Sequence, residues 1–482
     1  MTFSQKFTVH PVGQGLFYSG IFKIGTKVKF SMVFDCGTKS VAKAIQTEID
    51  LYRTETNISS TKTLDLLIIS HFDKDHVSHI EKLLDGNIKV KTLIMPFITF
   101  QERLFLVLRF LSQSKGNNSN KEFIIKFILD PFSTLKNNLD DDSEIYLIDG
   151  EDLGSPIPQI ENSNQDTFDF SENESFTIVF EEGEGVKSEL EDKDIEKTRF
   201  KSDEAKVYKV NHRNKGILKT STGLALMEFL FYKRNIGEED KEFFDKIEKL
   251  FFAKYVIQLS GLSEEHKLDK IVEIIKGINS FKGSGLQKIF VDAQKETSSQ
   301  TDKIKKEPLE EKEPQYLDII DSNTTSLCLL HKNLMSSLHQ NKHGRIIQIQ
   351  KFTIPQNRVN IPWCRFYQNT YSRNNNFPNV LLTSDTFLLK DVQVDPFLKH
   401  FQNYWNDFWL FQIPHHGSKK SSNFLLHSNI PSRAYNFINY GIPNKDKHPD
   451  QSVIYDLVAT GHSVRLIPVT QYQGLFFELI YP

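Results

Sequence analysis

The chain carries the stretch LDLLIISHFDKDH at residues 64–76. Its first half is short, almost wholly apolar and rich in branched side chains, which is typical of a strand covered on both faces. Its second half, HFDKDH, is dense in side chains of the metal-ligand type. On an extended turn His71 and Asp73 point the same way, and Asp75 and His76 follow where a helix begins. The stretch therefore predicts an α/β unit with its chemistry at the carboxyl end of a strand.

Imidazoles and carboxylates together suit zinc, manganese or iron rather than a thiolate site. The simpler alternative is that Asp73 and Asp75 only cap the following helix. Capping does not require His71 and His76 as well, so we favour metal ligands. A calcium-binding EF-hand is excluded, because the glycine at loop position six and the carboxylate at position twelve are both missing.

Strands and helices are predicted on both sides of this stretch. Before it, residues 6–38 have the pattern of strands and 39–52 that of a helix. From Thr324 onward strands return, with helices expected at 393–405 and 449–460. The two ends of the chain thus belong to one structural class.

The middle of the chain differs from its ends. Residues 140–200 are acidic and polar, which predicts a flexible segment, whereas 238–255 has the apolar spacing of an amphipathic helix. We therefore expect the division 1–114, 115–315 and 316–482, in which the middle part is a large insertion into one fold.

The composition of the chain argues against some classes of function. Lys and Arg number 59 against 62 Asp and Glu, for a formal net charge of −3, so the chain as a whole does not have the charge of a dedicated nucleic-acid binder. Nucleic acid would need a local basic patch, and our candidate is the stretch 201–219 with Lys206, Lys209, Arg213 and Lys215. The three cysteines form no CxxC pair, which argues against a disulfide framework. Without a signal-peptide pattern or a long apolar run, the sequence predicts a cytoplasmic protein with no membrane part.

Three further motifs follow in the second half. The strand LLTSD ends in Asp385, a carboxylate that could bridge two metal ions about 3.5–4 Å apart, although an aspartate after a strand is also a common turn former. The motif PHHGS follows the apolar strand FWLFQI and places His415 beside His416. His448 precedes a proline and a predicted helix, and this position by itself is no evidence for a functional role.

In order and spacing these motifs resemble the metallo-β-lactamase superfamily, and more narrowly the branch that contains the hydrolase domain of the bacterial DNA-uptake channel protein. Further matching pieces are VGQG at 12–15, FDCG at 34–37 and NTTSL at 323–327. The resemblance covers about residues 6–110 and 320–482. It implies an αββα sandwich in which these two parts of the chain close together.

The resemblance also implies roles for the motif residues. The implied ligands are His71 and Asp73 for a first divalent ion, Asp75, His76 and His416 for a second, and Asp385 as the bridge. Asp75 is also expected to take part in catalysis. His415 and His448 would lie near the substrate, contacting a phosphoryl oxygen or protonating the leaving group. Asp35 would orient the ligands from behind.

Two positions depart from the pattern of the superfamily. Asp73 stands where many members have histidine, and between residues 80 and 330 only His212 and His266 could supply a further ligand. A site poorer in histidine is richer in oxygen, which favours Mn²⁺ over Zn²⁺. Ser384 stands where the branch usually has glycine, and we expect it to narrow the cavity.

Three functions remain open. A two-metal phosphodiesterase or nuclease, using Mn²⁺ or Zn²⁺, is the interpretation that the motifs favour. A hydrolase of small phosphorylated or ester substrates would use the same site, in keeping with the acidic net charge. A regulatory or antiviral defence protein of bacteria would instead bind a protein partner through the 115–315 insertion and use the metal site as a sensor, which is an analogy rather than a derivation.

Overall fold

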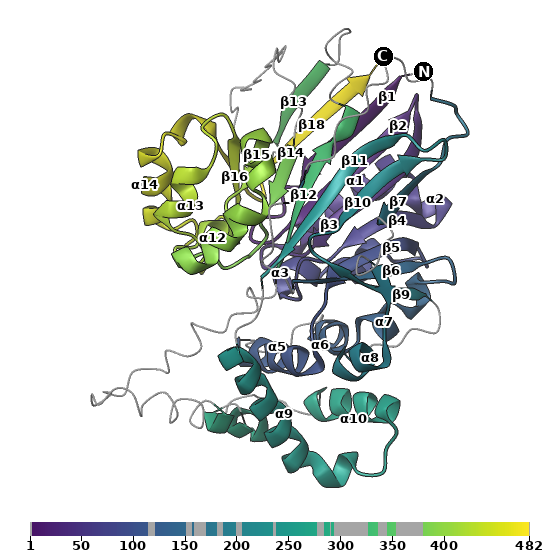
Figure 1. Ribbon diagram of the computed structural model, residues 1–482, viewed down its shortest axis with the longest axis vertical. Coiled ribbons are helices and arrows are strands. Elements are labelled where there is room, and N and C mark those ends of the chain that lie inside the picture. Colours follow the sequence, from purple (N-terminus) through teal and green to yellow (C-terminus); the bar gives the residue numbers. More distant parts are fainter. Residues whose placement is uncertain are drawn as a thin grey trace.

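The computed structural model describes residues 2–113, 121–150, 157–158, 170–180, 187–198, 205–234, 238–276, 284–289, 291–293, 326–335, 345–352 and 379–481. Across these residues the protein is a mixed α/β fold with two large sheets, of ten and eight strands (Figure 1). No helix within them is long and apolar enough to cross a membrane.

The first sheet brings the two ends of the chain together. Its strand order is β13 (Arg345–Phe352), β18 (Gln473–Tyr481), β1 (Phe3–Val9), β2 (Phe17–Ile24), β3 (Lys27–Cys36), β4 (Thr63–Ile68), β5 (Lys89–Pro96), β6 (Glu144–Asp149), β9 (Lys206–Asn211) and β8 (Lys187–Glu189). The strands β3, β4, β5, β6 and β9 run parallel to one another. Strand β1 pairs antiparallel with β18, so the N- and C-terminal strands lie side by side (Figure 1).

The second sheet is parallel on one side and antiparallel on the other. Its order is β17 (Leu466–Val469), β16 (Tyr435–Asn439), β15 (Phe408–Gln412), β14 (Asn379–Leu382), β12 (Leu327–Asn333), β11 (Ala225–Lys233), β10 (Lys215–Thr220) and β7 (Phe176–Phe180). The strands from β14 to β17 are parallel. Both sheets therefore have parallel strands whose carboxyl ends can carry a site.

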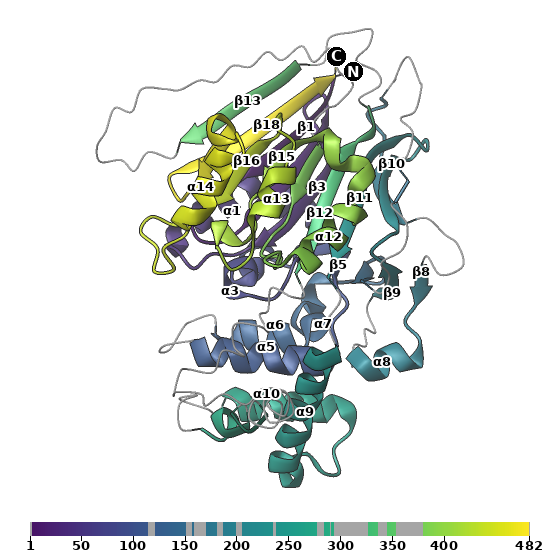
Figure 2. The same cartoon turned by 60° about the vertical axis from the view of Figure 1, so that its left-hand side comes forward.

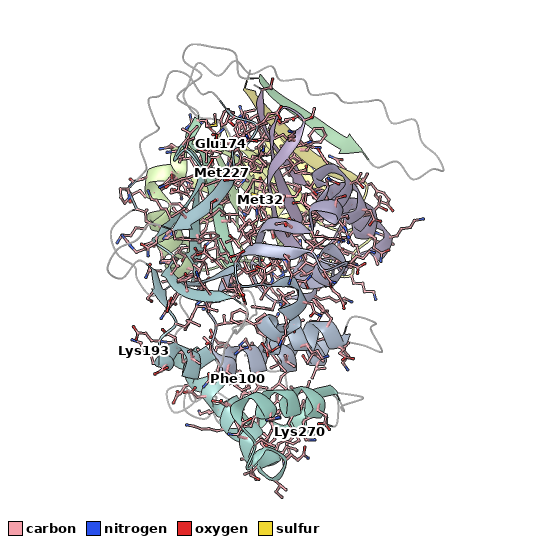
Figure 3. All side chains as sticks on the ribbon, turned by 90° about the vertical axis from the view of Figure 1, so that its right-hand side faces the viewer. Met32, Phe100, Glu174, Lys193, Met227 and Lys270 are labelled. Atoms are coloured by element: carbon pink, nitrogen blue, oxygen red, sulfur yellow. The ribbon has the colours of Figure 1, made fainter. Side chains whose placement is uncertain are left out.

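The two sheets share one apolar core. Met32 of β3 and Met227 of β11, one from each sheet, are both fully buried in it (Figure 3). Along β12, Leu329 points into this core while Cys328 and Leu330 belong to a second core on the outer face. This alternation follows from the two-residue period of a strand, and because both faces are covered, β12 is apolar on both.

Helices cover the outer face of each sheet. The first is covered by α1 (Ala42–Thr56), α4 (Ile80–Leu83), α5 (Phe100–Gln113) and α6 (Lys121–Leu129), against which α9 (Glu238–Leu259) and α10 (Glu264–Lys276) pack as a further layer. The second is covered by α12 (Asp391–His400), α13 (Phe424–Asn429) and α14 (Gln451–Ala459) (Figure 2). Short helices α2 (Ile58–Thr61), α3 (Lys74–Val77), α7 (Pro131–Thr134) and α8 (Asp192–Thr198) fill the connections. The helices expected at 393–405 and 449–460 correspond to α12 and α14.

The middle of the chain is part of both sheets. Within 115–315, β6, β8 and β9 extend the first sheet, and β7, β10 and β11 extend the second. The described residues of the acidic stretch 140–200, where we expect a flexible segment, include β6, β7, β8 and α8. In β7 the side chains of Phe176, Ile178 and Phe180 are buried, while Thr177 and Val179 between them are exposed. The apolar alternation was hidden by the acidic residues around it. Residues 151–156, 159–169, 181–186 and 199–200 lie outside the described residues.

The core histidine His331 makes stability depend on pH. Its ring is fully buried, its Nε2 lies 2.6 Å from the Tyr18 hydroxyl, and burial lowers its pKa to about 3. An unfolded histidine titrates near 6.5, so below that pH the unfolded state binds a proton that the folded state does not, and stability falls as the pH falls.

We therefore expect His331→Gln, which keeps a partner for Tyr18 but cannot titrate, to have a flatter pH profile. Between pH 6.5 and 5 the wild type should lose about 1.5 kcal/mol more than the variant in the free energy of unfolding. Urea unfolding at each pH measures this difference, and all other histidines cancel because both proteins carry them. Parallel profiles would show that His331 takes up a proton in the folded protein at about the same pH as in the unfolded chain.

Candidate metal centre

The loops after four parallel strands meet at one place. His71 follows β4, Asp35 ends β3, Asp385 follows β14 and the two histidines of PHHGS follow β15. The Nε2 atom of His71 lies 3.9 Å from the Asp385 carboxylate, although the two residues are far apart in sequence. The structure thus brings together the ligand candidates from both ends of the chain, as expected.

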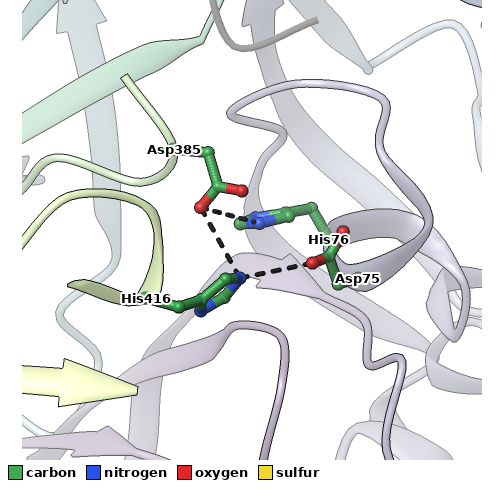
Figure 4. A group of neighbouring side chains, drawn as sticks. All are labelled: Asp75, His76, Asp385 and His416. Atoms are coloured by element: carbon green, nitrogen blue, oxygen red, sulfur yellow. Dashed lines mark hydrogen bonds and ion pairs between the residues drawn. The ribbon is translucent and has the colours of Figure 1, made fainter. Parts of the chain in front are cut away.

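A buried group of four side chains could hold a metal ion. Asp75, His76, Asp385 and His416 each offer a ligand atom, and these atoms all lie within 4.8 Å of one another. None of the four residues is more than 1% exposed. Figure 4 shows the His416 ring between the carboxylates of Asp75 and Asp385, with His76 directed at the same oxygen of Asp385.

The Asp385 carboxylate has histidines on both of its sides. On one side, Oδ1 lies 3.3 Å from His76 Nε2 and 3.7 Å from His416 Nε2. On the other, Oδ2 lies 3.6 Å from His415 Nε2 and 3.9 Å from His71 Nε2. Three of these distances exceed the length of a hydrogen bond. Two ligands at 2.0–2.2 Å from one ion lie about 3–4 Å apart, so the spacing fits ligands that share an ion.

Hydrogen bonds at the opposite ring nitrogens fix the histidine tautomers. His76 Nδ1 donates to Asp35 at 2.7 Å, and His416 Nδ1 donates to the Asn439 carbonyl at 2.7 Å. The Ser70 hydroxyl donates to Asp35, so His71 Nδ1, 2.9 Å from that hydroxyl, must be the donor there. In the neutral form of each of these three rings, the proton therefore lies on Nδ1 and the lone pair on Nε2, the atom that faces Asp385. Such partners behind the ligand are usual at metal sites.

The electrostatics of the cluster favour a cation at its centre. Burial alone would lower the pKa of His76, but Asp385 and Asp35 outweigh it and hold that pKa well above its ordinary value. Burial would raise the pKa of Asp385, but His415, His416 and His76 outweigh it and hold that pKa well below its ordinary value. The same field that attracts a proton to Nε2 attracts a metal ion.

The backbone around the site adopts conformations that L-residues rarely take. Asp35, Ser384, His415 and His416 have φ angles of 56°, 49°, 48° and 57°. A Cβ on Gly37 would lie 2.5 Å from the backbone between Asp75 and His76, so only glycine allows the two loops to meet. Strained residues gathered at one place indicate a functional site.

Ser384 joins the two parts of the site instead of narrowing the cavity. Its hydroxyl donates to Ser70 at 2.7 Å and its side chain is fully buried. It is absent from the cavity wall, so the expectation that it narrows the cavity was wrong. Its φ of 49° explains why glycine also suits this position.

A cavity of about 930 Å³ opens beside the cluster. Its wall includes Asp73, His415 and His448, so these three candidates face open space, whereas the other ligand candidates are enclosed. The rings of His415 and His448 lie 5.7 Å apart between centroids. Burial and the neighbouring His415 lower the pKa of His448.

Lys39 is a site residue that the sequence analysis missed. Its Nζ lies 2.9 Å from the Asp75 carboxylate, and its side chain is 39% exposed on the cavity wall. Burial would lower its pKa, but Asp75 and Asp73 raise it above the ordinary value, so the ammonium stays charged. It lies two residues after FDCG, and that adjacency was the available signal.

The cavity wall is richer in cations than in carboxylates. The cations are Lys39, Arg109, Lys419, Lys420 and Lys445, and the carboxylates are Asp73, Asp446 and Asp450. Two lysines of the basic patch proposed for 201–219 form ion pairs within the fold. Lys209 pairs with Asp149 and Asp194, and Lys215 with Glu228. Residues 201–204 lie outside the described part.

The two histidines considered as a further ligand lie elsewhere. His212 packs against His400, with ring centroids 4.6 Å apart. His266 is on α10, hydrogen-bonded to Ser263. Neither belongs to the groups of residues that could hold a metal.

The comparisons with protein families and with curated proteins identify no relative from which the role of this site could be taken. No family model matches the sequence, and the search of curated proteins returned no match. The interpretation of the site therefore depends on its own residues.

Proposed function

We propose that the protein is a metal-dependent hydrolase of the metallo-β-lactamase fold that cleaves phosphodiester bonds with two divalent ions, Mn²⁺ or Zn²⁺. The observation that carries this proposal is the Asp385 carboxylate, with histidine Nε2 atoms 3.3 and 3.7 Å from one oxygen and 3.6 and 3.9 Å from the other. A carboxylate with ligands on both sides suits a bridge between two ions. Asp75, His76 and His416 would hold one ion, and His71 with Asp73 the other.

When bound, two such ions neutralise charge on the attacking and leaving oxygens of a phosphoryl group. The chain itself would bind and orient the substrate. Lys39, exposed on the cavity wall beside Asp75, would contact a phosphoryl oxygen. His448, also on the wall, would form a hydrogen bond with the leaving group. The excess of cations over carboxylates on this wall favours an anionic substrate.

The proposal is tested with chelator-treated full-length protein reloaded with Mn²⁺, Zn²⁺ or Mg²⁺. We expect Mn²⁺-stimulated hydrolysis of bis(p-nitrophenyl) phosphate and of DNA, measured as product release over time. Linear and circular DNA separate end-dependent from internal cleavage. Hydrolysis of the small diester alone would favour a small substrate. No hydrolysis of any phosphodiester by metal-loaded protein would overturn the proposal.

A further inference from the structure

The structure contains a histidine that the sequence analysis placed at the substrate but that lies at metal-ligand distance. His415 Nε2 is 3.6 Å from Asp385 Oδ2, slightly closer than His71 Nε2, which approaches the same oxygen at 3.9 Å. On the opposite side, His416 Nε2 lies 3.7 Å from Oδ1. The adjacent histidines of PHHGS thus face opposite oxygens of one carboxylate.

The backbone holds both rings in these directions. His415, His416 and Gly417 have φ angles of 48°, 57° and 78°, so three consecutive residues are left-handed. The His415 N–H donates to the Ser384 carbonyl at 3.0 Å, which fixes the turn to the residue before Asp385. A Cβ on Gly417 would lie 2.7 Å from Pro449, so the turn also packs closely against the loop that carries His448.

His415 has a polar partner at Nδ1, the ring nitrogen directed away from Asp385, as the other histidines of the site do. Its Nδ1 lies 2.7 Å from the Ser421 hydroxyl, as His76 Nδ1 lies 2.7 Å from Asp35 and His416 Nδ1 lies 2.7 Å from Asn439. In each ring Nδ1 meets a polar partner and Nε2 faces Asp385. Such an outer partner sets the orientation of a ligating imidazole.

From this geometry we infer that His415 is a ligand of the first metal ion, together with His71 and the Oδ2 atom of Asp385, and supplies the further histidine ligand that residues 80–330 do not. This inference rests on the metal-binding part of the proposed function. Its side chain is 19% exposed, so this ion would lie between the buried cluster and the cavity. The first site would then be richer in nitrogen than the sequence suggested, and closer to what Zn²⁺ accepts.

The test compares two substitutions of one residue. His415→Asn keeps an amide near the position of Nδ1 but removes the atom that reaches Asp385, and asparagine tolerates a left-handed φ. His415→Gln extends its amide to about the position of Nε2, where the oxygen can bind Mn²⁺. His266→Asn, on the exposed part of α10, is the matched control.

The readouts are bound Mn²⁺ after gel filtration and the electron paramagnetic resonance spectrum. We expect about two Mn²⁺ and a coupled spectrum for the wild type and His266→Asn, because ions about 3.5–4 Å apart interact. His415→Asn should retain about one Mn²⁺ with an uncoupled spectrum, and His415→Gln should recover part of the second. The recovery separates loss of a ligand from loss of the fold.

Two coupled Mn²⁺ in His415→Asn would overturn the inference and leave the proposed function standing, with His415 at the substrate. One Mn²⁺ in both the wild type and His415→Asn would overturn it as well, while metal-dependent hydrolysis could still be observed. A wild type that retains no Mn²⁺ and hydrolyses no phosphodiester would overturn both.

Discussion

Replacing Asp385 by asparagine is expected to reduce phosphodiester hydrolysis by about 10³-fold or more. The carboxylate has histidines at both oxygens, whereas an amide offers one oxygen and an NH2 group, whose N–H donors repel a cation. The variant should therefore lose at least one ion. Together with that ion it should lose the charge stabilisation that two ions give to the transition state. The measurements are kcat/KM for bis(p-nitrophenyl) phosphate with Mn²⁺ and the metal content of the purified variant.

The matched control is Asp85→Asn, which removes a carboxylate that is 66% exposed and paired only with Lys82 at 3.9 Å in the described structure. We expect wild-type turnover from it, since exposed pairs contribute little. Thermal unfolding of both variants checks that each is folded. Full activity of Asp385→Asn after removal of metal by a chelator would show that the two-metal mechanism is wrong.

Asp35→Asn is expected to weaken metal binding by about 10–100-fold, although the side chain touches no ion. Asp35 accepts hydrogen bonds from the Ser70 N–H at 2.7 Å and from His76 Nδ1 at 2.7 Å. An amide nitrogen facing His76 would donate to Nδ1 and move the ring proton to Nε2, and a protonated Nε2 cannot bind a metal. Isothermal titration with Mn²⁺ measures the affinity.

The control for this effect is Asp65→Asn. Asp65 lies near the other end of β4 and accepts from the N–H and hydroxyl of Ser31 at 2.9 and 3.0 Å, so it has a similar set of bonds without a histidine. It should lose stability but keep its Mn²⁺ affinity. Equal affinities for Asp35→Asn and the wild type would mean that the His76 tautomer is set by something other than Asp35.

The sequence predicted which candidate side chains meet better than it predicted their surroundings. His71, Asp75 and Asp385 follow apolar strands, and the carboxyl ends of such strands converge, so their meeting could be anticipated. Of the partners behind them, Asp35 was implied by the family resemblance. The Ser70 hydroxyl and the Asn439 carbonyl could not be anticipated, because such groups have no distinctive pattern in a sequence. Lys39 was missed for the same reason, since its role depends on an Asp75 contact made in space.

The middle of the chain was harder to interpret because its charges conceal its packing. Strand β7 has only five residues between acidic stretches, and its buried side chains decide its place in the sheet. Lys209 and Lys215 suggested a basic groove, but their carboxylate partners Asp149 and Glu228 come from other strands. Which charges are neutralised is a property of the tertiary fold, which local composition does not report.

The division of the site between the two ends of the chain has a consequence for biosynthesis. A ribosome that adds roughly 5–20 residues per second makes Asp75 roughly 15–60 s before Asp385. During that interval the histidines after β4 have no Asp385 carboxylate to face, and β1 has no β18 beside it. We therefore expect a nascent chain to be unable to assemble the candidate metal centre until Asp385 and His416 have been made, so that an ability to cut phosphodiester bonds would be acquired only after that point.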